Sequence, residues 1–389
     1  MEIELRLKEI LIEQGVDPNG WGLVTELAEY LNVHRHTAKK LLQGNTPNGE
    51  AKGVNRISLR TLGELCNWLH RKHEVPMDRL PRDLFGFAPP PALWQAVSSV
   101  RTTTLFVGEC LQKQKSGPIR LWVSSRDSTV ANAIVEQLCL VKGESTRGIN
   151  DIHTEYVPFR FITDNDDQKT RREYVDQQAK AAKKMFARTH VARSSSAHVY
   201  IGSQEVNGML EEWVASLFGC KPFVPATGQA QTPFYVWFRH PDSLVQSCFG
   251  GVVPPPGYTG KGGPGIYYRK RNRWLVCPFQ KNKKDTGLVI TYRDPGANIV
   301  DVAIFGLSGR ATAAMADRVV PDTKYFYPPG LAWRGRQLGV YVCQFGVTAE
   351  KVQNNRTYHI REFKVIPIEN KILKQFLRPG KSRKEARES

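Results

Sequence analysis

The spacing of apolar residues changes once along the chain, close to residue 90. Before this point, apolar side chains recur three and four positions apart, which is the spacing of amphipathic helices. From about residue 100, short apolar runs alternate with amphipathic stretches, as in a chain that alternates strands and helices. The sequence therefore predicts an all-α five-helix domain followed by a larger α/β domain with a mixed sheet. The predicted helices of the first domain are 3–14, 23–31, 34–43, 57–73 and a shorter one at 77–86.

A proline-rich segment, FAPPP at 87–91, marks the predicted boundary between the two domains. No apolar run approaches the roughly 18 residues that span a membrane, and the start of the chain lacks the apolar block of a signal peptide. We therefore expect a cytoplasmic protein with no membrane partner. The predicted divisions are a helical domain at 1–86, a linker at 87–100, an α/β domain at 101–368 and a basic tail at 369–389.

The positive charge of the chain lies in its second part. The net charge is +18, yet the first 95 residues hold 12 basic and 12 acidic side chains. Residues 371–389 alone hold seven basic and two acidic side chains. A charge of this size usually indicates an anionic partner such as nucleic acid, although it can also serve solubility alone.

The segment ELAEYLNVHRHTAKKLLQG, at 26–44, has the pattern of two short helices joined by a tight turn. It resembles the helix-turn-helix segment of the lambda-repressor-like (Cro-type) family, with no gap in the pattern. In that pattern Ala28 is the small residue that lets the helices cross closely, and Val33 and Leu41 are apolar residues of the small core. The family's five-helix domain would occupy about residues 3–86.

This resemblance implies that the second helix of the pair lies in the major groove of double-stranded DNA. Arg35 is the best candidate to read a base, because a guanidinium can bind guanine bidentately. The sequence departs from the family at Val24, where the family often has glutamine, and at Asn32, where it often has glycine. A helical hairpin that binds protein would show the same spacing. The implied DNA-contacting residues are Thr25, His34, Arg35, His36, Thr37, Lys39 and Lys40.

Two glycine-containing segments of the α/β domain could approach a ligand closely. In the first, a strand ends in Gly202-Ser203 and a helix follows, whose free N–H groups would attract an anion. In the second, another strand passes into a helix that begins with small residues. The candidate ligand-binding residues are Gly202, Ser203, Asn207, Asp285, Gly306, Gly309 and Thr312.

The segment from about 195 to 320 resembles an uncharacterised α/β domain that is fused to helix-turn-helix modules in bacteria and archaea. The resemblance rests on these glycine, asparagine and aspartate positions, with Asp294 in place of the usual asparagine and Ala311 in place of the usual glycine. It implies a Rossmann-like pocket for a small molecule or nucleotide. Ordinary turn glycines would produce the same pattern. The segment 124–127 offers a comparable phosphate site through Arg126, or simply a helix N-cap.

Basic residues alternate with aromatic ones at 267–274, YYRKRNRW, and a second basic run follows the next apolar segment. Arginines interleaved with aromatics could hold phosphates and stack nucleobases. A solvated hairpin edge protected by charge would look the same. The residues of this predicted basic patch are Arg269, Lys270, Arg271, Arg273, Lys281, Lys283 and Lys284.

The sequence contains no catalytic or metal-binding motif that we could assign. The α/β part has no HExxH pair and no G-x-S-x-G segment, and none of the seven cysteines forms a CxxC pair. We therefore predict no catalytic residue, metal or cofactor. The preferred hypothesis is a bacterial or archaeal DNA-binding regulator, acting as a homodimer, whose α/β domain senses a small ligand or nucleotide. The alternatives are a nucleotide-processing enzyme or defence effector, and a non-enzymatic nucleic-acid-binding protein.

Overall fold

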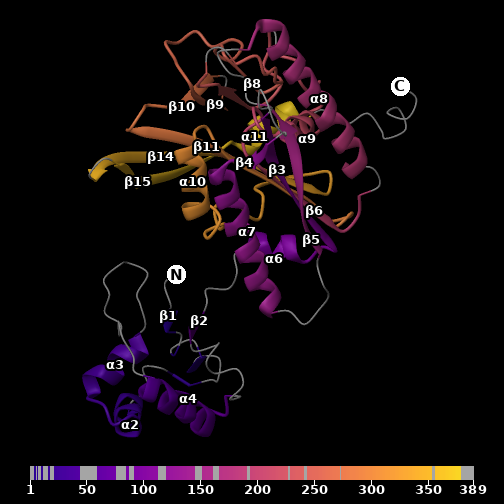
Figure 1. Cartoon of the computed structure of the whole chain (residues 1–389). Helices are drawn as coiled ribbons and strands as arrows, with labels where there is room; N and C mark the ends of the chain where they lie inside the picture. Colours follow the sequence, from indigo (N-terminus) through magenta and orange to yellow (C-terminus); the bar gives the residue numbers. More distant parts are fainter. Residues whose placement is uncertain are drawn as a thin grey trace. The chain divides into compact units, whose positions relative to one another are not determined.

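The computed structural model describes most of the chain, which divides into two compact units, Met1–Pro90 and Pro91–Ser389. Figure 1 shows the helices and strands of both units, coloured along the sequence and labelled where there is room. The described residues are 4–5, 7, 10–11, 16–17, 22–43, 59–75, 85–86, 92–112, 120–144, 151–160, 166–190, 193–226, 228–240, 243–271, 273–352 and 355–377.

The first unit combines short helices with a pair of very short strands. Helices α2 (Leu23–Tyr30), α3 (Arg35–Gln43) and α4 (Leu59–His73) form where the sequence predicts them. Strands β1 (Glu4–Leu5) and β2 (Phe85–Gly86) pair antiparallel, so the predicted helices 3–14 and 77–86 are wrong at these positions. Pairing between segments far apart in the sequence gives the backbone groups partners that local periodicity cannot reveal.

The core of the first unit lies between its helices. Leu27 of α2, Leu41 of α3 and Leu65 of α4 are buried in one apolar cluster, together with Leu7 and Ile10 from the start of the chain. The amphipathic spacing that predicted the helices therefore also predicted which of their faces is buried.

The second unit contains a large mixed sheet and a smaller sheet. In the large sheet, β5, β3, β6 and β12 are adjacent and parallel in that order, and β11 and β14 continue the sheet antiparallel. The predicted mixed α/β architecture is therefore confirmed. The strands of the large sheet are β3 (Thr102–Gln112), β4 (Arg120–Val123), β5 (Asp151–Phe159), β6 (Ser196–Ile201), β11 (Lys284–Asp294), β12 (Ile299–Gly306), β13 (Leu331–Trp333), β14 (Arg336–Val352) and β15 (Asn355–Pro367). Those of the smaller sheet are β7 (Phe234–Trp237), β8 (Gly250–Gly251), β9 (Gly265–Lys270) and β10 (Arg273–Pro278).

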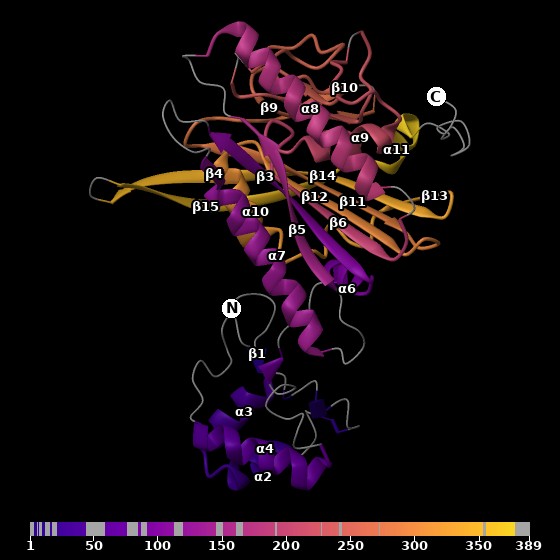
Figure 2. The same ribbon diagram turned by 45° about the vertical axis from the view of Figure 1, so that its right-hand side comes forward.

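Helices cover both faces of the large sheet (Figure 2). On one face, α6, α7 and α10 bury their apolar side chains against β3, β6 and β12. On the other face, α9 and α11 and the smaller sheet form a second apolar core, with the end of α8 packed against it. The bounds of these helices are α6 (Ala92–Ser98), α7 (Ser125–Glu144), α8 (Gln168–His190), α9 (Gly208–Phe218), α10 (Gly309–Arg318) and α11 (Asn370–Phe376).

Two of these helices lie in segments for which the sequence predicted no regular structure. Helix α6 falls inside the predicted linker 87–100, yet its Trp94 is fully buried and donates a hydrogen bond from Nε1 to the Val320 carbonyl oxygen at 2.7 Å. Helix α11 falls inside the predicted basic tail, and its Ile372 and Leu373 are buried. Both helices are short, and their burial depends on contacts with distant parts of the chain.

Candidate functional site

The α2–α3 pair of the first unit has the geometry of two short helices joined by a tight turn. Leu27 and Ala28 of α2 are buried together with Ala38 and Leu41 of α3. The turn passes through Asn32, whose φ of 50° lies in the left-handed region. Glycine adopts this region freely and asparagine tolerates it better than most residues. The local geometry therefore explains why asparagine can stand where the helix-turn-helix pattern often has glycine.

The residues predicted to contact DNA differ in exposure. Arg35, His36 and Lys39 are exposed on the side of α3 that faces away from the helical core. His34 is exposed as well, but its Nδ1 accepts a hydrogen bond from the His36 backbone N–H at 3.2 Å, so the imidazole caps the start of α3. Half-buried positions are occupied by Thr25, Thr37 and Lys40.

In the second unit, the loops and helix starts that follow β4, β6 and β12 come together at residues 124–127, 202–206 and 306–310, which we call the carboxyl-end site. A Cβ placed on Gly202 would lie 3.3 Å from Oδ2 of Asp127, and a Cβ placed on Gly309 would lie 3.3 Å from Cγ of Arg126. Gly202 has a φ of 93°, which lets the chain turn sharply after β6. The structure thus brings two of the predicted ligand-binding glycines against the segment 124–127.

Two polar side chains of the carboxyl-end site are buried, and one of them has no hydrogen-bond partner among the described residues. Asp127, in the first turn of α7, is only 6% exposed, and burial raises the pKa of its carboxyl to about 6. Gln204 is 1% exposed, and neither its Nε2 nor its Oε1 is hydrogen-bonded within the described structure. Buried polar groups without partners are uncommon and often occur where a ligand or water completes the site.

Asp285 joins the carboxyl-end site through Ser308, the N-cap of α10. The Ser308 hydroxyl donates to Oδ2 of Asp285 and accepts from the backbone N–H of Arg310 at 3.1 Å. Nε of Arg310 lies 4.0 Å from the same Oδ2. Burial raises the pKa of Asp285, and its hydrogen bonds from Ser308 and Thr286 and the nearby arginines offset part of that rise. Neither Ser308 nor Arg310 was among the predicted residues, although a serine before a run of small residues is an N-cap signal.

Three other predicted ligand-binding residues have structural roles. The fully buried Asn207 caps α9 and donates from Nδ2 to the carbonyl oxygens of Phe106 and Ile201, both at 2.9 Å. A Cβ on Gly306 would lie 2.2 Å from the backbone nitrogen of Thr312, so this glycine permits the close packing of α10. The Thr312 hydroxyl donates to the Ser308 carbonyl oxygen at 3.1 Å, within α10's first turn. The remaining predicted residue, Ser203, is half-buried.

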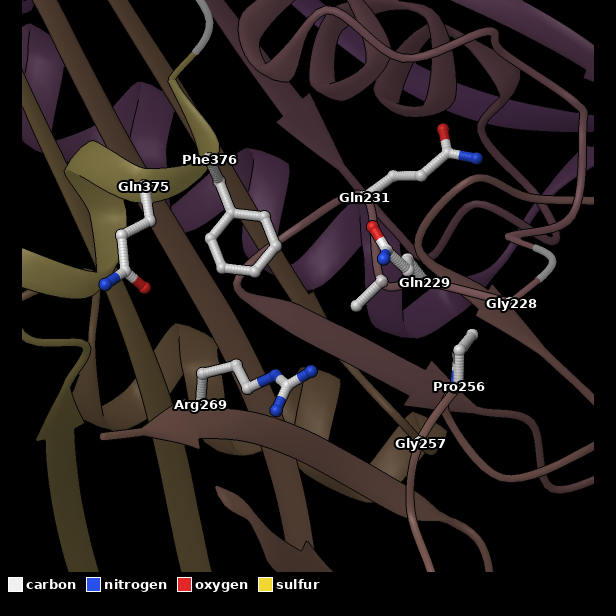
Figure 3. A pocket seen from close by; sticks show the side chains of 9 residues that line it. Gly228, Gln229, Gln231, Pro256, Gly257, Arg269, Gln375 and Phe376 are labelled. Carbon is white, nitrogen blue, oxygen red and sulfur yellow. The ribbon is translucent and has the colours of Figure 1, made fainter. Parts of the chain in front are cut away.

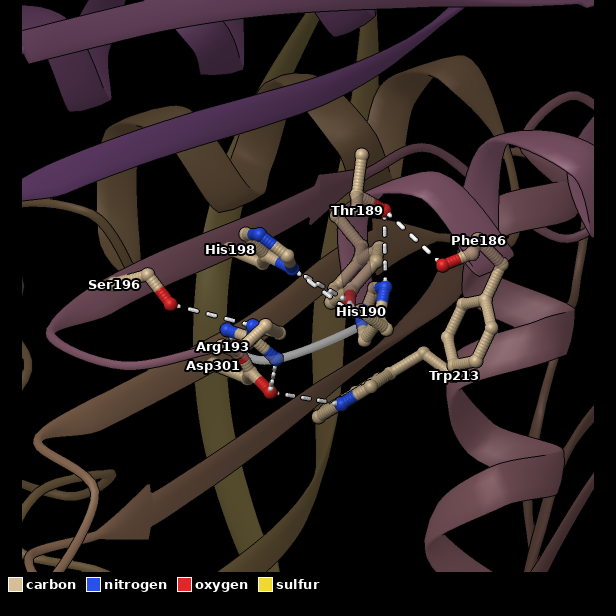
Figure 4. Close-up of polar contacts among 9 residues, drawn as sticks. Phe186, Thr189, His190, Arg193, Ser196, His198, Trp213 and Asp301 are labelled. Carbon is tan, nitrogen blue, oxygen red and sulfur yellow. Dashed lines mark hydrogen bonds and ion pairs between the residues drawn. The ribbon is translucent and has the colours of Figure 1, made fainter. Parts of the chain in front are cut away.

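A second polar cluster, which the sequence did not predict, surrounds Asp301 (Figure 4), which lies near the amino end of β12. Arg193 binds Asp301 through two hydrogen bonds, of 2.6 and 3.0 Å, and Nε1 of Trp213 donates to the same carboxylate at 3.1 Å. His198 stands opposite Asp301 in the register of β6 and β12. We call this group, together with His190 and Tyr200, the amino-end network. An aspartate within the apolar run IVDVAIF was the available sequence signal for it.

Burial governs protonation in the amino-end network. It lowers the pKa of His190 to about 4 and that of His198 to about 3, and the positive charge of Arg193 acts in the same direction. Burial acts to raise the pKa of Asp301, but the charge and hydrogen bonds of Arg193 outweigh it and hold this pKa below its ordinary value. At neutral pH the network therefore contains neutral histidines and one internal ion pair.

The predicted basic patch is a hairpin in the structure, and two of its three aromatic residues are buried. Strands β9 and β10 pair antiparallel through a turn at Arg271, whose φ is 54°. Tyr267 is fully buried and Trp274 is 7% exposed, so neither can stack a nucleobase in this arrangement, whereas Tyr268 is half-buried. Tyr267 and Trp274 pack against Tyr235 in a small apolar cluster of their own. Exposed basic residues of the patch are Lys270, Arg271, Arg273, Lys281, Lys283 and Lys284, whereas Arg269 is half-buried.

Comparisons with known proteins give no relative for this chain. No family model matches it, and no curated protein and no solved structure matches it. Among the described residues, no group of three or more histidine, cysteine, aspartate or glutamate side chains could hold a metal ion. Within the same residues, no helix is both long and apolar enough to cross a membrane.

Proposed function

We propose that the protein is a sequence-specific regulator that binds double-stranded DNA through α2 and α3, acting as a homodimer. The observation that carries this proposal is the surface of α3. It presents Arg35, His36 and Lys39 on its exposed side, while Ala38 and Leu41 pack against α2. An exposed basic helix held at a fixed angle by a partner helix is what a recognition helix requires. In this proposal the first unit is a variant of the lambda-repressor-like five-helix domain.

The DNA-binding proposal is tested with the full chain and a pool of random duplexes. Selected duplexes are bound by wild type and by Arg35→Ala/Lys39→Ala, with Arg71→Ala/Lys72→Ala as the matched control, because Arg71 and Lys72 are exposed on α4. We expect the first variant to lose selected binding at least tenfold and to lower the salt slope by about 2, while the control retains both. Equal binding by wild type and the first variant would refute the role of α3 and leave the basic second unit as the binder.

We further propose that the second unit is a Rossmann-like domain whose carboxyl-end site binds a small molecule or nucleotide. Ligands of open α/β sheets bind at the carboxyl ends of the strands, at the point where the strand order reverses. Here the first parallel strand, β3, lies between β5 and β6, and the N-terminus of α7 lies beside Gly202 of the loop after β6. Support comes from the buried carboxyl of Asp127, whose pKa burial raises, and from the amide of Gln204, which has no partner among the described residues.

Arg126 provides the direct test of the carboxyl-end ligand. The Arg126 side chain is exposed and lies against the start of α10. The N-terminus of a helix favours a bound negative charge. Calorimetric titration of ATP and NAD into wild type and Arg126→Ala would measure its contribution, with the exposed Arg172 of α8 replaced by alanine as control. We expect at least tenfold weaker binding for Arg126→Ala only. A phosphate site here would be contradicted if neither ATP nor NAD bound to wild type. It would also be contradicted if Arg126→Ala and Arg172→Ala bound the nucleotide equally well.

A nucleotide-processing enzyme is the second candidate, and the carboxyl of Asp127 favours it. A pKa of about 6 suits a group that takes up and releases a proton near neutral pH. Turnover of ATP or NAD that Asp127→Asn abolishes, with binding retained, would support an enzyme. Asn207 is unsuitable for this test, because its amide caps α9 and its loss would disturb the fold.

A further inference from the structure

A cavity of about 450 Å³ lies in the second unit between the smaller sheet and α11 (Figure 3). Its wall is formed by the loop before β7, the loop around Gly257, Arg269 of β9 and Phe376 of α11. None of its lining residues belongs to the loops of the carboxyl-end site. Its volume falls within the range of about 300–1,000 Å³ that is common for small-molecule sites.

The guanidinium of Arg269 is held in place at this cavity. It stacks over the ring of Trp274, with its central carbon 4.5 Å from the ring centroid. The indole is fixed in turn, because Trp274 is only 7% exposed and its Nε1 donates to the Pro256 carbonyl oxygen at 3.0 Å. A planar guanidinium whose orientation is fixed by stacking is suited to bidentate binding of a phosphate or carboxylate.

The other lining residues define the rest of the ligand. The ring of Phe376 and the guanidinium of Arg269 both extend into the space that these segments enclose (Figure 3). Phe376 also packs against the second apolar core, which limits its movement. The lining includes the amide side chains of Gln229, Gln231 and Gln375, and the described lining residues contain one basic and no acidic side chain. The cavity thus offers a cation, an aromatic face and amide groups that can both donate and accept.

The loop positions around the cavity leave room for a ligand. Gly228 and Gly257 line it with φ of 75° and 76°, and a Cβ on either would have no heavy atom within 4 Å. Backbone turns in this region strongly favour glycine, so the two loops curve sharply around the opening. Their peptide groups can then approach a bound molecule without interference from side chains.

We propose that this cavity binds a nucleoside monophosphate. The phosphate would bind the Arg269 guanidinium, the base would stack on Phe376, and the glutamine amides would bind the edge of the base. This site is separate from the carboxyl-end site and does not depend on it.

The proposal is tested by calorimetric titration of the full chain with AMP, GMP, CMP and UMP. The matching nucleosides, which lack the phosphate, and inorganic phosphate, which lacks the base, are the ligand controls. We expect at least one monophosphate to bind, and its nucleoside and inorganic phosphate to bind at least tenfold more weakly. Failure of all four monophosphates to bind would overturn the proposal.

Variants locate any binding that is found. Arg269→Gln should weaken it at least tenfold, and Phe376→Leu several-fold, whereas Lys270→Gln, an exposed neighbour on the same strand, should leave it unchanged. Gln229→Ala, in an exposed loop position, gives a variant that does not disturb the core, and we expect it to shift the preference among the four bases. Arg126→Ala should have no effect here, which distinguishes this cavity from the carboxyl-end site. Wild-type affinity and base preference in both Arg269→Gln and Gln229→Ala would overturn the assignment.

Discussion

The amino-end network and the carboxyl-end site each bury a carboxylate against the same strands, but they do so in opposite ways. Asp301 is bound by Arg193 and Trp213, and its pKa is held below the ordinary value. For Asp127, burial is the cause that shifts the pKa, and it raises this pKa to about 6 without an arginine to offset the rise. A buried charge that is paired within the fold is complete, whereas one without a partner leaves an interaction for something else to supply.

This difference indicates which end of the sheet maintains the fold and which end is available for function. The contacts of the amino-end network join α8, α9, β6 and β12 through internal bonds. The carboxyl-end site instead gathers two helix starts, Arg126 and the buried acids Asp127 and Asp285 at the carboxyl ends of β6 and β12. The predictions below test this division of roles.

The largest effect is expected from Arg193→Ala. This substitution leaves the carboxylate of Asp301 buried without its cation, which should lower the free energy of unfolding by about 3–5 kcal/mol. The matched control is Arg336→Ala, which removes a half-exposed pair with Asp294 at 3.1 Å and should cost about 1 kcal/mol or less. Urea denaturation of both variants measures the difference. Similar losses in the two would remove the distinction between a structural network and a surface ion pair.

The histidines of the amino-end network should make the protein lose stability in acid. In the folded protein the pKa of His190 is about 4 and that of His198 about 3, below the ordinary 6.5. Between each lowered pKa and 6.5, the unfolded chain therefore binds more protons than the folded chain. Stability should therefore fall as pH drops below about 6.5, by about 1.4 kcal/mol per pH unit for each histidine.

The histidine prediction is measured by urea denaturation of wild type and His198→Gln from pH 4 to 7. The variant should show a shallower pH dependence, by about one proton, whatever its stability at pH 7. An unchanged slope would mean that His198 titrates normally in the folded protein.

Asp127 should act in the opposite direction. Its folded pKa of about 6 exceeds the ordinary 3.8, so the folded chain binds more protons between these values and stability falls as pH rises from about 4 to 6. Wild type should lose up to about 3 kcal/mol of unfolding free energy between pH 4 and pH 7 because of Asp127. The variant Asp127→Asn has no carboxyl at this position and should not show this loss. Thermal or urea unfolding at both pH values tests this. A less stable variant at pH 7 would show that the ionised carboxylate is already stabilised within the fold.

The smallest effects concern two glycines of the predicted ligand pattern. Gly306→Ala places a Cβ 2.2 Å from backbone of α10 and should cost about 1–3 kcal/mol. Gly309→Ala places one 3.3 Å from the flexible Arg126 side chain and should change stability by less than about 0.5 kcal/mol. We expect Gly309→Ala, but not Gly306→Ala, to leave stability intact in urea denaturation. An equal and large loss of unfolding free energy in the two variants would mean that both glycines serve packing. An equal and negligible loss would mean that neither does.

Local sequence patterns predicted where helices and strands form better than they predicted what these elements pack against. The spacing of Leu27 and Leu41 predicted α2 and α3 and their buried faces, because the apolar residues of an amphipathic helix recur at helical spacing on the face that is buried. The spacing around Trp94 did not predict α6, because this helix is short. The indole of Trp94 donates a hydrogen bond to Val320, far along the chain. The glycines at 202, 306 and 309 were recognised as unusual, but the sequence did not show which of them serves helix packing.

The candidate sites show the same limit. Asp285 was predicted, but its partner Ser308 belongs to another strand–helix junction. Arg193 and Asp301 meet although 108 residues separate them, and neither position has a local signal that names the other. The alternation of Tyr267 and Trp274 with arginines indicated residues that could stack nucleobases, yet the packing of the smaller sheet buries both.

The sequence by itself determined the division into a helical part and an α/β part, the charge difference between them and the exposed basic face of α3. These depend on composition and on periodicities within single elements, which a linear pattern records. Only the tertiary structure decided which carboxylates are paired, which glycines are covered and where a cavity remains. Those properties depend on burial, and burial is set by contacts between segments that are distant in the sequence.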